Sequence, residues 1–146
     1  ISSLAKSRYV MLEFPVDIDY ETIAEAIRDI SMDGYIPIVS HVETYSCLDE
    51  DEDMVEDLIK LGAYIQVDSG SVMGENGHDI RNFARKLVKN EMVHFIATDA
   101  HDCDDKAPLM KECAEYIERK CGFDYMNEVL YINPMAIIEN DDVEII

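Results

Sequence analysis

Positive charge and cysteine are both scarce in this sequence. Its 146 residues include 12 Lys and Arg against 32 Asp and Glu, so the formal net charge is −20 at pH 7. Nucleic acids and anionic membrane surfaces bind proteins through Lys and Arg, so this balance argues against both kinds of partner. The four cysteines include no CxxC pair and are too few for a disulfide scaffold. We therefore expect reduced thiols in a cytoplasmic protein.

Features that identify several large protein classes are also missing. The sequence has no apolar run long enough to span a membrane and no signal peptide at its start, so membrane insertion is not expected. No GxGxxG or GxxxxGKS loop follows any apolar run, which leaves nucleotide-binding folds without support. Cys113 and Arg119 match the CxxxxxR spacing of cysteine-dependent phosphatases. The stretch between them has no glycine and includes Glu115 and Glu118, which do not make a phosphate cradle, so we interpret the match as chance.

The sequence does contain a regular alternation of β-rich apolar runs and amphipathic helical patterns. The predicted strands are residues 9–14, 35–40, 63–67 and 93–98. The predicted helices span about 20–32, 49–61, 77–89 and 107–121, with a last helical turn after Pro134. Alternation with short connections predicts one α/β domain of parallel βα units over residues 1–146. These units could form an open doubly wound sheet or part of a barrel.

Polar residues stand at the C-terminal end of every predicted strand. In strand order they are Glu13; Ser40, His41 and Glu43; Gln66 and Asp68; and Asp99 and His101. The C-terminal ends of parallel strands open on one face, which carries the chemistry of α/β barrels. Carboxylates and imidazoles together are ligands for Zn, Mn or Fe. We therefore predict a metal-binding cluster formed by Glu13, His41, Asp99 and His101.

The remaining polar residues have other expected roles. Gln66 should line the same mouth as a substrate contact or a neighbour of the ligands, because amides are weak metal ligands. Glu43 is equally consistent with this lining and with a loop carboxylate that holds a backbone N–H group. His78 and His94 do not follow a strand, so we expect both to be structural.

Four blocks in order carry a family resemblance. They run from Leu12 to Pro15, Pro37 to Tyr45, Gln66 to Gly74, and His94 to His101. Together they resemble the later part of the bacterial PHP-family tyrosine phosphatases of capsular and exopolysaccharide loci. The resemblance implies a distorted (β/α)7 TIM-like barrel with a multinuclear metal site. It also implies that the metal ligands are Glu13, His41, Asp99 and His101.

The resemblance implies an enzyme that hydrolyses phosphotyrosine on a partner bacterial tyrosine kinase. Divalent cations would activate water and hold the phosphate oxygens, with manganese expected first and iron, cobalt or zinc as alternatives. Asp99 and His101 would be catalytic residues as well as ligands. Glu43, Gln66 and Lys106 would contact the substrate or support the ligands.

The sequence departs from the family pattern in three places. It has no His-x-His pair, so we expect the C-terminal portion of a longer protein, weak or inactive by itself. An open barrel edge would also favour pairing with a second copy, as a homo-oligomer. The family's HPER block ends here in Thr44, and the segment after His101 offers only Lys106 in place of an arginine. Two alternatives therefore stay open: a PHP-type phosphoesterase acting on small phosphorylated metabolites, and a non-catalytic module that docks on a kinase.

Overall fold

A curved parallel sheet organises the chain. The structure is a computed structural model that describes residues 7–98 and 103–139. Its strands are β1 (Tyr9–Leu12), β2 (Ile36–Val39), β3 (Tyr64–Asp68) and β4 (Phe95–Ala97). They lie in the order β1-β2-β3-β4, and every neighbouring pair is parallel. The α/β class with parallel βα units is therefore confirmed. Among the described residues the sheet is open and does not close into a barrel.

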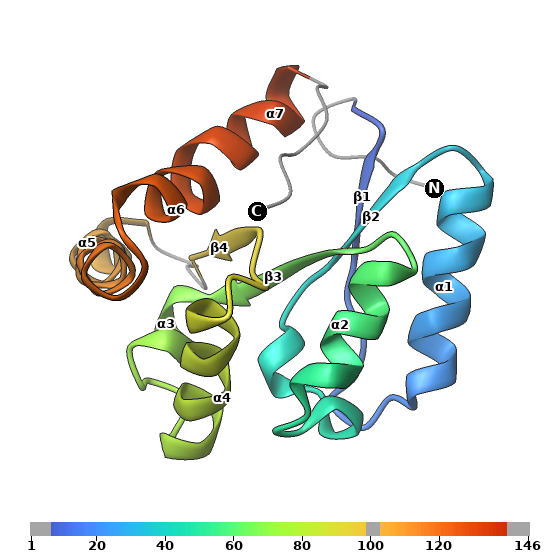
Figure 1. Cartoon of the computed structure of the whole chain (residues 1–146), viewed down its shortest axis with the longest axis horizontal. Helices are drawn as coiled ribbons and strands as arrows, with labels where there is room; N and C mark the ends of the chain where they lie inside the picture. The colour runs from blue at the N-terminus through green and yellow to red at the C-terminus, as the bar shows by residue number, and fades with distance from the viewer. Residues whose placement is uncertain (1–6, 99–102, 140–146) are drawn as a thin grey trace.

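Helices connect and flank the strands. They are α1 (Tyr20–Met32), α2 (Glu52–Lys60), α3 (Ser69–Val72), α4 (His78–Lys89), α5 (Cys103–Cys121), α6 (Phe123–Asn127) and α7 (Asn133–Glu139). Shorter helical segments are η2 (Val42–Thr44), η3 (Ser46–Leu48) and the π-helical η4 (Glu128–Ile132). In the view of Figure 1, α1 and α2 lie on one side of the strands, and α5, α6 and α7 lie on the other. No helix in the described part of the chain is long and apolar enough to cross a lipid bilayer.

Local signals in the sequence explain the helix boundaries. Asp19 caps α1 by accepting hydrogen bonds from the Thr22 N–H group at 3.2 Å and the Thr22 hydroxyl at 2.6 Å. Asp51 caps α2 in the same way, directly before the acidic first turn that favours a helix N-terminus. After α2, Gly62 has a φ of 113°, a conformation that glycine adopts readily and other residues rarely adopt.

Several predicted boundaries were wrong. The first strand was expected to extend to residue 14, but it ends at Leu12. The fourth was expected to cover residues 93–98, but it covers only Phe95–Ala97. The residues beyond these ends still favour a strand by type, but the chain there no longer pairs with the neighbouring strand. The short helix α3 was not predicted. The single turn expected after Pro134 is the end of a nearly continuous helical run from Phe123 to Glu139.

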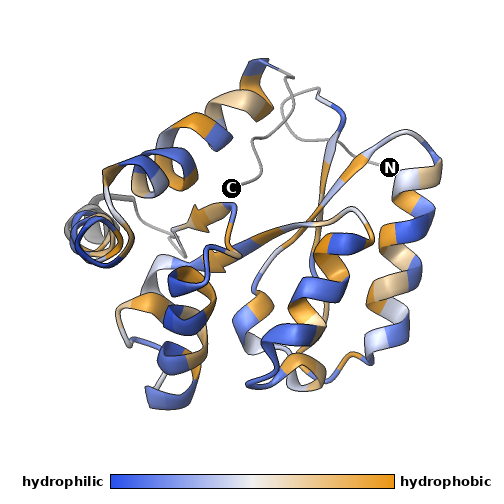
Figure 2. Ribbon diagram, in the orientation of Figure 1, coloured by the Kyte–Doolittle hydropathy of each residue, from blue (hydrophilic) through white to orange (hydrophobic). Residues whose placement is uncertain are grey.

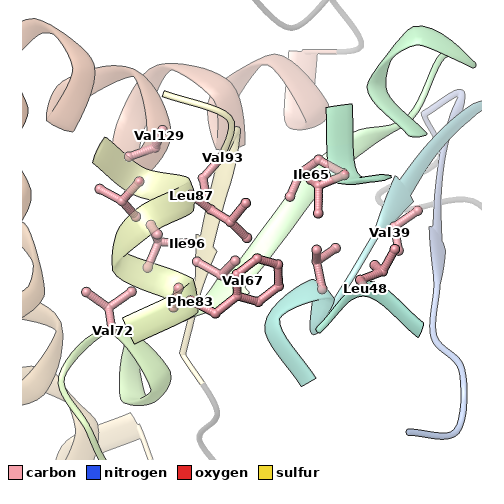
Figure 3. Packing of buried hydrophobic residues seen from close by; sticks show 14 of the residues in the cluster. Val39, Leu48, Ile65, Val67, Val72, Phe83, Leu87, Val93, Ile96 and Val129 are labelled. Carbon is pink, nitrogen blue, oxygen red and sulfur yellow. The ribbon is translucent and has the colours of Figure 1, made fainter. Parts of the chain in front are cut away.

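Side-chain alternation gives the sheet two different faces. Val39, Ile65, Val67 and Ile96 face the helices and join the main core. Figure 3 shows Val67 and Ile96 near Phe83 and Leu87 of α4. In Figure 2, hydrophobic colour likewise marks the strands and bands of the helices.

On the opposite face, Tyr9, Ile38 and Phe95 form a second, smaller apolar cluster together with Ala136 of α7. Gln66 and Asp68 alternate with the core residues of β3, so they lie on this second face. The second face is therefore apolar at its centre and polar toward the C-terminal ends of the strands.

Candidate metal and phosphate site

Three polar side chains meet where β1, β2 and β3 end. Glu13 follows β1 directly, His41 lies two residues beyond β2, and Asp68 is the last residue of β3. The His41 Nδ1 atom lies 2.8 Å from Asp68 Oδ2, and its Nε2 atom lies 3.5 Å from Glu13 Oε1. His41 therefore joins the ends of two other strands through its two ring nitrogens.

Exposure increases along this row of side chains. The side chain of Asp68 is 4% exposed, that of His41 is 33% exposed and that of Glu13 is 63% exposed. A carboxylate only accepts hydrogen bonds, so the Nδ1–H of His41 donates to Asp68 when the imidazole is neutral. Its Nε2 lone pair then faces Glu13 at the open side. A buried carboxylate that orients a histidine in this way is typical of the outer shell of metal sites.

The backbone at His41 is strained. His41 has φ 57° and ψ 32°, the left-handed region that residues with a side chain rarely occupy. Thr44 stabilises the turn, because its N–H and its hydroxyl both donate to the His41 carbonyl, at 2.9 Å and 2.7 Å. Such strain persists where the surrounding structure enforces it, and it is enriched at functional sites. Thr44, which stands where the related family has arginine, thus turns its hydroxyl back onto the loop.

The electrostatics of His41 favour a cation at this position. Burial alone would lower the pKa of His41, but the carboxylates of Asp68, Glu43 and Glu13 outweigh burial and raise it above its usual value. A proton on Nε2 is therefore held by the negative groups around the ring. A divalent cation placed there would gain from the same field.

Glu43 holds the backbone of Asp68 in place. Its Oε2 accepts a hydrogen bond from the Asp68 N–H group at 3.0 Å, so it holds a backbone N–H group, one of its two expected roles. Burial, reinforced by the neighbouring Asp68 carboxylate, raises the pKa of Glu43 to about 7. Glu43 is 4% exposed and its carboxyl group contacts the end of β3, so it does not open onto the mouth.

One tyrosine hydroxyl ties the ends of β1 and β2 together. The hydroxyl of Tyr45 donates to the Ser40 carbonyl at 2.6 Å and accepts from the Phe14 N–H group at 3.1 Å. Ser40 precedes His41, and Phe14 follows Glu13. Tyr45 is 1% exposed. It therefore sets the spacing between the two strand ends that carry Glu13 and His41.

The other predicted site residues have varied outcomes. Gln66 is nearly buried, on the same face of β3 as Asp68, with its Nε2 atom 3.8 Å from Met11 Sδ. Asp99 and His101 lie outside the described residues, as does the side chain of Lys106. The part of the site that these three residues were predicted to form therefore stays a prediction.

The two remaining histidines have structural surroundings. The buried His94 accepts a hydrogen bond on Nδ1 from the Ile65 N–H group at 3.0 Å, and its ring packs edge-on against Tyr64. His78 is exposed at the start of α4, beside Arg81 and Asn82. Neither lies in the row formed by Glu13, His41 and Asp68.

The donor atoms fit part of a divalent metal site. Two ligands that each lie about 2.1 Å from one metal ion are roughly 3 Å apart, close to the 3.5 Å between His41 Nε2 and Glu13 Oε1. Within residues 7–98 and 103–139, no group of three His, Cys, Asp or Glu side chains is arranged to hold an ion. Glu13 and His41 therefore provide two donors, and a complete site requires others.

Sequence reasoning missed the contributions of Asp68 and Tyr45. Asp68 was recognised as a polar strand end but not as the partner of His41, which is 27 residues away in the chain. The available signal was that Asp68 lies two residues after Gln66 in the same strand, so both side chains point to the same face of the sheet. Nothing local in the sequence indicates that the Tyr45 hydroxyl bridges two strands.

Comparison with known proteins places this chain in a family. The profile of the family described as "Capsular polysaccharide synthesis, CpsB/CapC" matches residues 1–139. The chain belongs to the CpsB/CapC family. The family resemblance seen in the four sequence blocks is thereby confirmed.

Relatives in the CpsB/CapC family include named phosphatases. The chain is 32% identical over 143 residues to the tyrosine-protein phosphatase CpsB of Streptococcus pneumoniae, covering 94% of this chain and 59% of that protein. It is 30% identical over 120 residues to the tyrosine-protein phosphatase YwqE of Bacillus subtilis, covering 82% and 47%. The chain thus spans about half to three fifths of the length of these relatives.

A solved structure shares the fold. It comes from work on YwqE of Bacillus subtilis and CpsB of Streptococcus pneumoniae, described there as metal-dependent tyrosine phosphatases. The match has a TM-score of 0.87 and 27% sequence identity, and it covers 97% of this chain and 57% of the other. The arrangement of β1 to β4 and their helices is therefore the arrangement of part of that structure.

Proposed function

We propose that this chain carries part of the active site of a metal-dependent protein-tyrosine phosphatase that acts on a bacterial tyrosine kinase in capsular or exopolysaccharide synthesis. The observation that carries the proposal is the orientation of His41, whose Nδ1 is held by the buried Asp68 while its Nε2 faces Glu13. The names of the CpsB/CapC relatives supply the reaction. The proposed location is the cytoplasm.

The described residues have different proposed roles in holding a cation. Asp68 fixes the tautomer and the direction of the His41 ring, and Glu43 fixes the backbone of Asp68. Tyr45 holds the strand ends on which Glu13 and His41 stand. Asp99 and His101, which follow β4 in the sequence, are proposed as the further ligands and as catalytic residues.

A divalent ion bound there, with manganese proposed first and iron, cobalt or zinc as alternatives, would polarise the phosphoryl oxygens and acidify a water molecule. The chain's own residues keep its donors in place. The strained His41 turn and the buried Asp68 carboxylate fix the imidazole before any ligand arrives, so little ordering remains to be done on binding.

The proposed full architecture is a distorted (β/α)7 TIM-like barrel. Both β1 and β4 are paired on one side only among the described residues. The second face of the sheet, with its apolar centre and polar C-terminal rim, has the character of a barrel interior. Additional strands beside β1 and β4 would extend the sheet and curve it around this face.

A second candidate function is hydrolysis of small phosphorylated metabolites. It is favoured by Thr44, which makes hydrogen bonds to the His41 carbonyl and presents no guanidinium group to a phosphate. A substrate recognised mainly by its own phosphate and the metal ions would need no such arginine. Comparison of a phosphotyrosine peptide with small phosphate monoesters discriminates between the two candidates.

The test measures metal affinity and phosphatase rate in four proteins. These are the unmodified protein, His41→Ala, Asp68→Asn and the control Asp29→Asn, which removes an exposed carboxylate on α1. We expect Asp68→Asn to weaken manganese binding by about 10–100-fold, because the imidazole loses its orienting partner. His41→Ala should weaken it at least as much, and Asp29→Asn should leave it unchanged.

Equal metal affinity in all four proteins would contradict the proposed site. Metal binding without phosphatase activity on any phosphate ester, in a protein extended to the length of the CpsB/CapC relatives, would contradict the proposed reaction. A rate on small monoesters that exceeds the rate on phosphopeptides would favour the second candidate.

A further inference from the structure

A pocket lined mainly by cationic side chains lies away from the strand ends. It has a volume of about 610 Å³ and is formed by α2, α4 and α5. Its charged and aromatic lining consists of Glu52, Arg85, Lys86, Lys89, Tyr116 and Lys120, and two asparagines complete it. Glu13, His41, Asp68 and Tyr45 do not line it. The pocket therefore belongs to the outer helical layer and is separate from the candidate metal site.

The charge of this pocket is opposite to that of the protein. The chain has only 12 Lys and Arg among its 146 residues, and four of them line this one pocket. Glu52 is the single carboxylate in the lining. The last turns of α4 and α5 also meet here, and each helix C-terminus carries about half a negative charge. Lysines near a helix end often serve only to balance that dipole, but here the cations exceed both dipoles and Glu52 by roughly two charges.

Arg85 is held rigidly at the wall of the pocket. Its Nε–H donates to the Val72 carbonyl at 2.8 Å, and its guanidinium carbon lies 4.3 Å from the centre of the Tyr116 ring. The Tyr116 side chain is 4% exposed, so this stacking surface is itself fixed in the core. The guanidinium group is thus positioned before a ligand binds, which reduces the entropy lost on binding.

The lysines are differently engaged. Lys86 lies 3.7 Å from Glu52, whose other oxygen accepts a hydrogen bond from Asn90. Lys89 and Lys120 are exposed and form no ion pair with any residue whose side chain the structure describes. Two exposed ammonium groups therefore line the pocket together with the fixed guanidinium group of Arg85.

We propose that this pocket binds a small anion that carries two or more phosphate groups. A rigid guanidinium group with several ammonium groups matches the geometry and charge of phosphate oxygens. The volume lies within the range of about 300–1,000 Å³ that small-molecule sites occupy. In a protein of net charge −20, a locally positive pocket also concentrates small anions that the remaining surface repels. The proposal is independent of the phosphatase reaction.

The test uses pyrophosphate as the probe, with chelator present so that no metal site contributes. Calorimetry measures its dissociation constant, and amide chemical shifts locate the binding site. The test variant is the double substitution Lys89→Ala with Lys120→Ala. The matched control is Lys60→Ala with Lys111→Ala, which removes the same charge from exposed positions outside the pocket.

We expect saturable binding that weakens at least tenfold in the test variant and less than twofold in the control. Shift changes should centre on Arg85, Lys86 and Lys120. Equal weakening in the two double variants, or shift changes spread over the surface, would show that only general electrostatics is involved and would overturn the proposal. Tighter binding of a glutamate hexapeptide than of pyrophosphate would also overturn it, in favour of an acidic protein segment.

A further arm compares ADP with pyrophosphate. Tighter binding of ADP assigns the pocket to nucleoside phosphates, and equal binding assigns it to the phosphate groups alone. Both results support the shared chemistry of the proposal.

Discussion

At the scale of single residues, the Tyr45 hydroxyl holds the ends of β1 and β2 together through two hydrogen bonds. Tyr45→Phe would leave the Phe14 N–H group and the Ser40 carbonyl without this partner. We expect the free energy of unfolding in urea to fall by about 1–3 kcal/mol, the usual effect of leaving buried polar groups unpaired. Metal affinity should fall as well, because Glu13 and His41 lose their fixed spacing.

The control for Tyr45 is Tyr131→Phe. Tyr131 is 59% exposed, so removal of its hydroxyl should change the free energy of unfolding by less than about 0.5 kcal/mol. If both substitutions have the same small effect, the Tyr45 hydroxyl does not organise the strand ends.

His94 gives the protein a specific pH dependence. Burial lowers the pKa of His94 to about 4. An unfolded histidine titrates near pH 6.5, so between about pH 6.5 and pH 4 the unfolded chain binds the proton more readily than the folded chain. The stability that neutral His94 contributes is thus present above pH 6.5 and is lost as the pH falls toward 4. The loss should approach about 3 kcal/mol.

The measurement is urea unfolding at pH 7 and pH 5 for the unmodified protein, His94→Gln and His78→Gln. Glutamine can still accept the Ile65 N–H hydrogen bond but does not titrate. We expect the change in the free energy of unfolding from pH 7 to pH 5 to be less unfavourable in His94→Gln than in the unmodified protein. It should be unchanged in His78→Gln, because His78 is exposed. Equal pH dependence in all three proteins would contradict this account of His94.

At the scale of elements, α1 shows how one face of a helix stabilises the sheet. Ile23, Ala24, Ile27 and Ile30 of α1 are buried. The next residue after Ile27, Arg28, is half exposed and lies 4.0 Å from Glu21 in an exposed ion pair. The amphipathic pattern therefore indicates that α1 stabilises the fold mainly through its buried apolar face.

We expect Ile27→Ala to lower the free energy of unfolding by about 2–5 kcal/mol, through lost burial and the cavity left behind. Arg28→Ala should cost less than about 1 kcal/mol, because exposed ion pairs contribute little. Thermal or urea unfolding of the two neighbouring variants measures both. A cost for Arg28→Ala that matches that of Ile27→Ala would contradict the assignment of faces.

At the scale of the whole molecule, the net charge of −20 opposes folding. Compact folding brings the carboxylates closer together, and salt screens their repulsion as the Debye length falls from about 30 Å at 0.01 M to about 8 Å at 0.15 M. We therefore expect the melting temperature to rise as NaCl increases over this range. A melting temperature that stays constant or falls would show that local ion pairs outweigh the net repulsion.

The sequence by itself determined the elements of this fold and the residue types of its candidate site. Strand and helix periods, the Asp19 cap and the Gly62 stop act over a few residues, so a linear reading finds them. The rule that parallel strands open at a common edge also placed Glu13 and His41 together. Exact strand ends, helix α3 and the continuous C-terminal helices were missed, because packing against neighbours overrides local propensity.

Only the tertiary structure decided which groups touch. The contact of Asp68 with His41 joins residues 27 apart, and the Tyr45 hydroxyl reaches Phe14 across 31. The pocket of Arg85, Lys86, Lys89 and Lys120 likewise requires two helices to pack with a third. No period or motif encodes such contacts, because they depend on how strands and helices are placed in space. The sequence therefore determines which groups are available, and the packing of the sheet against its helices determines which of them act together.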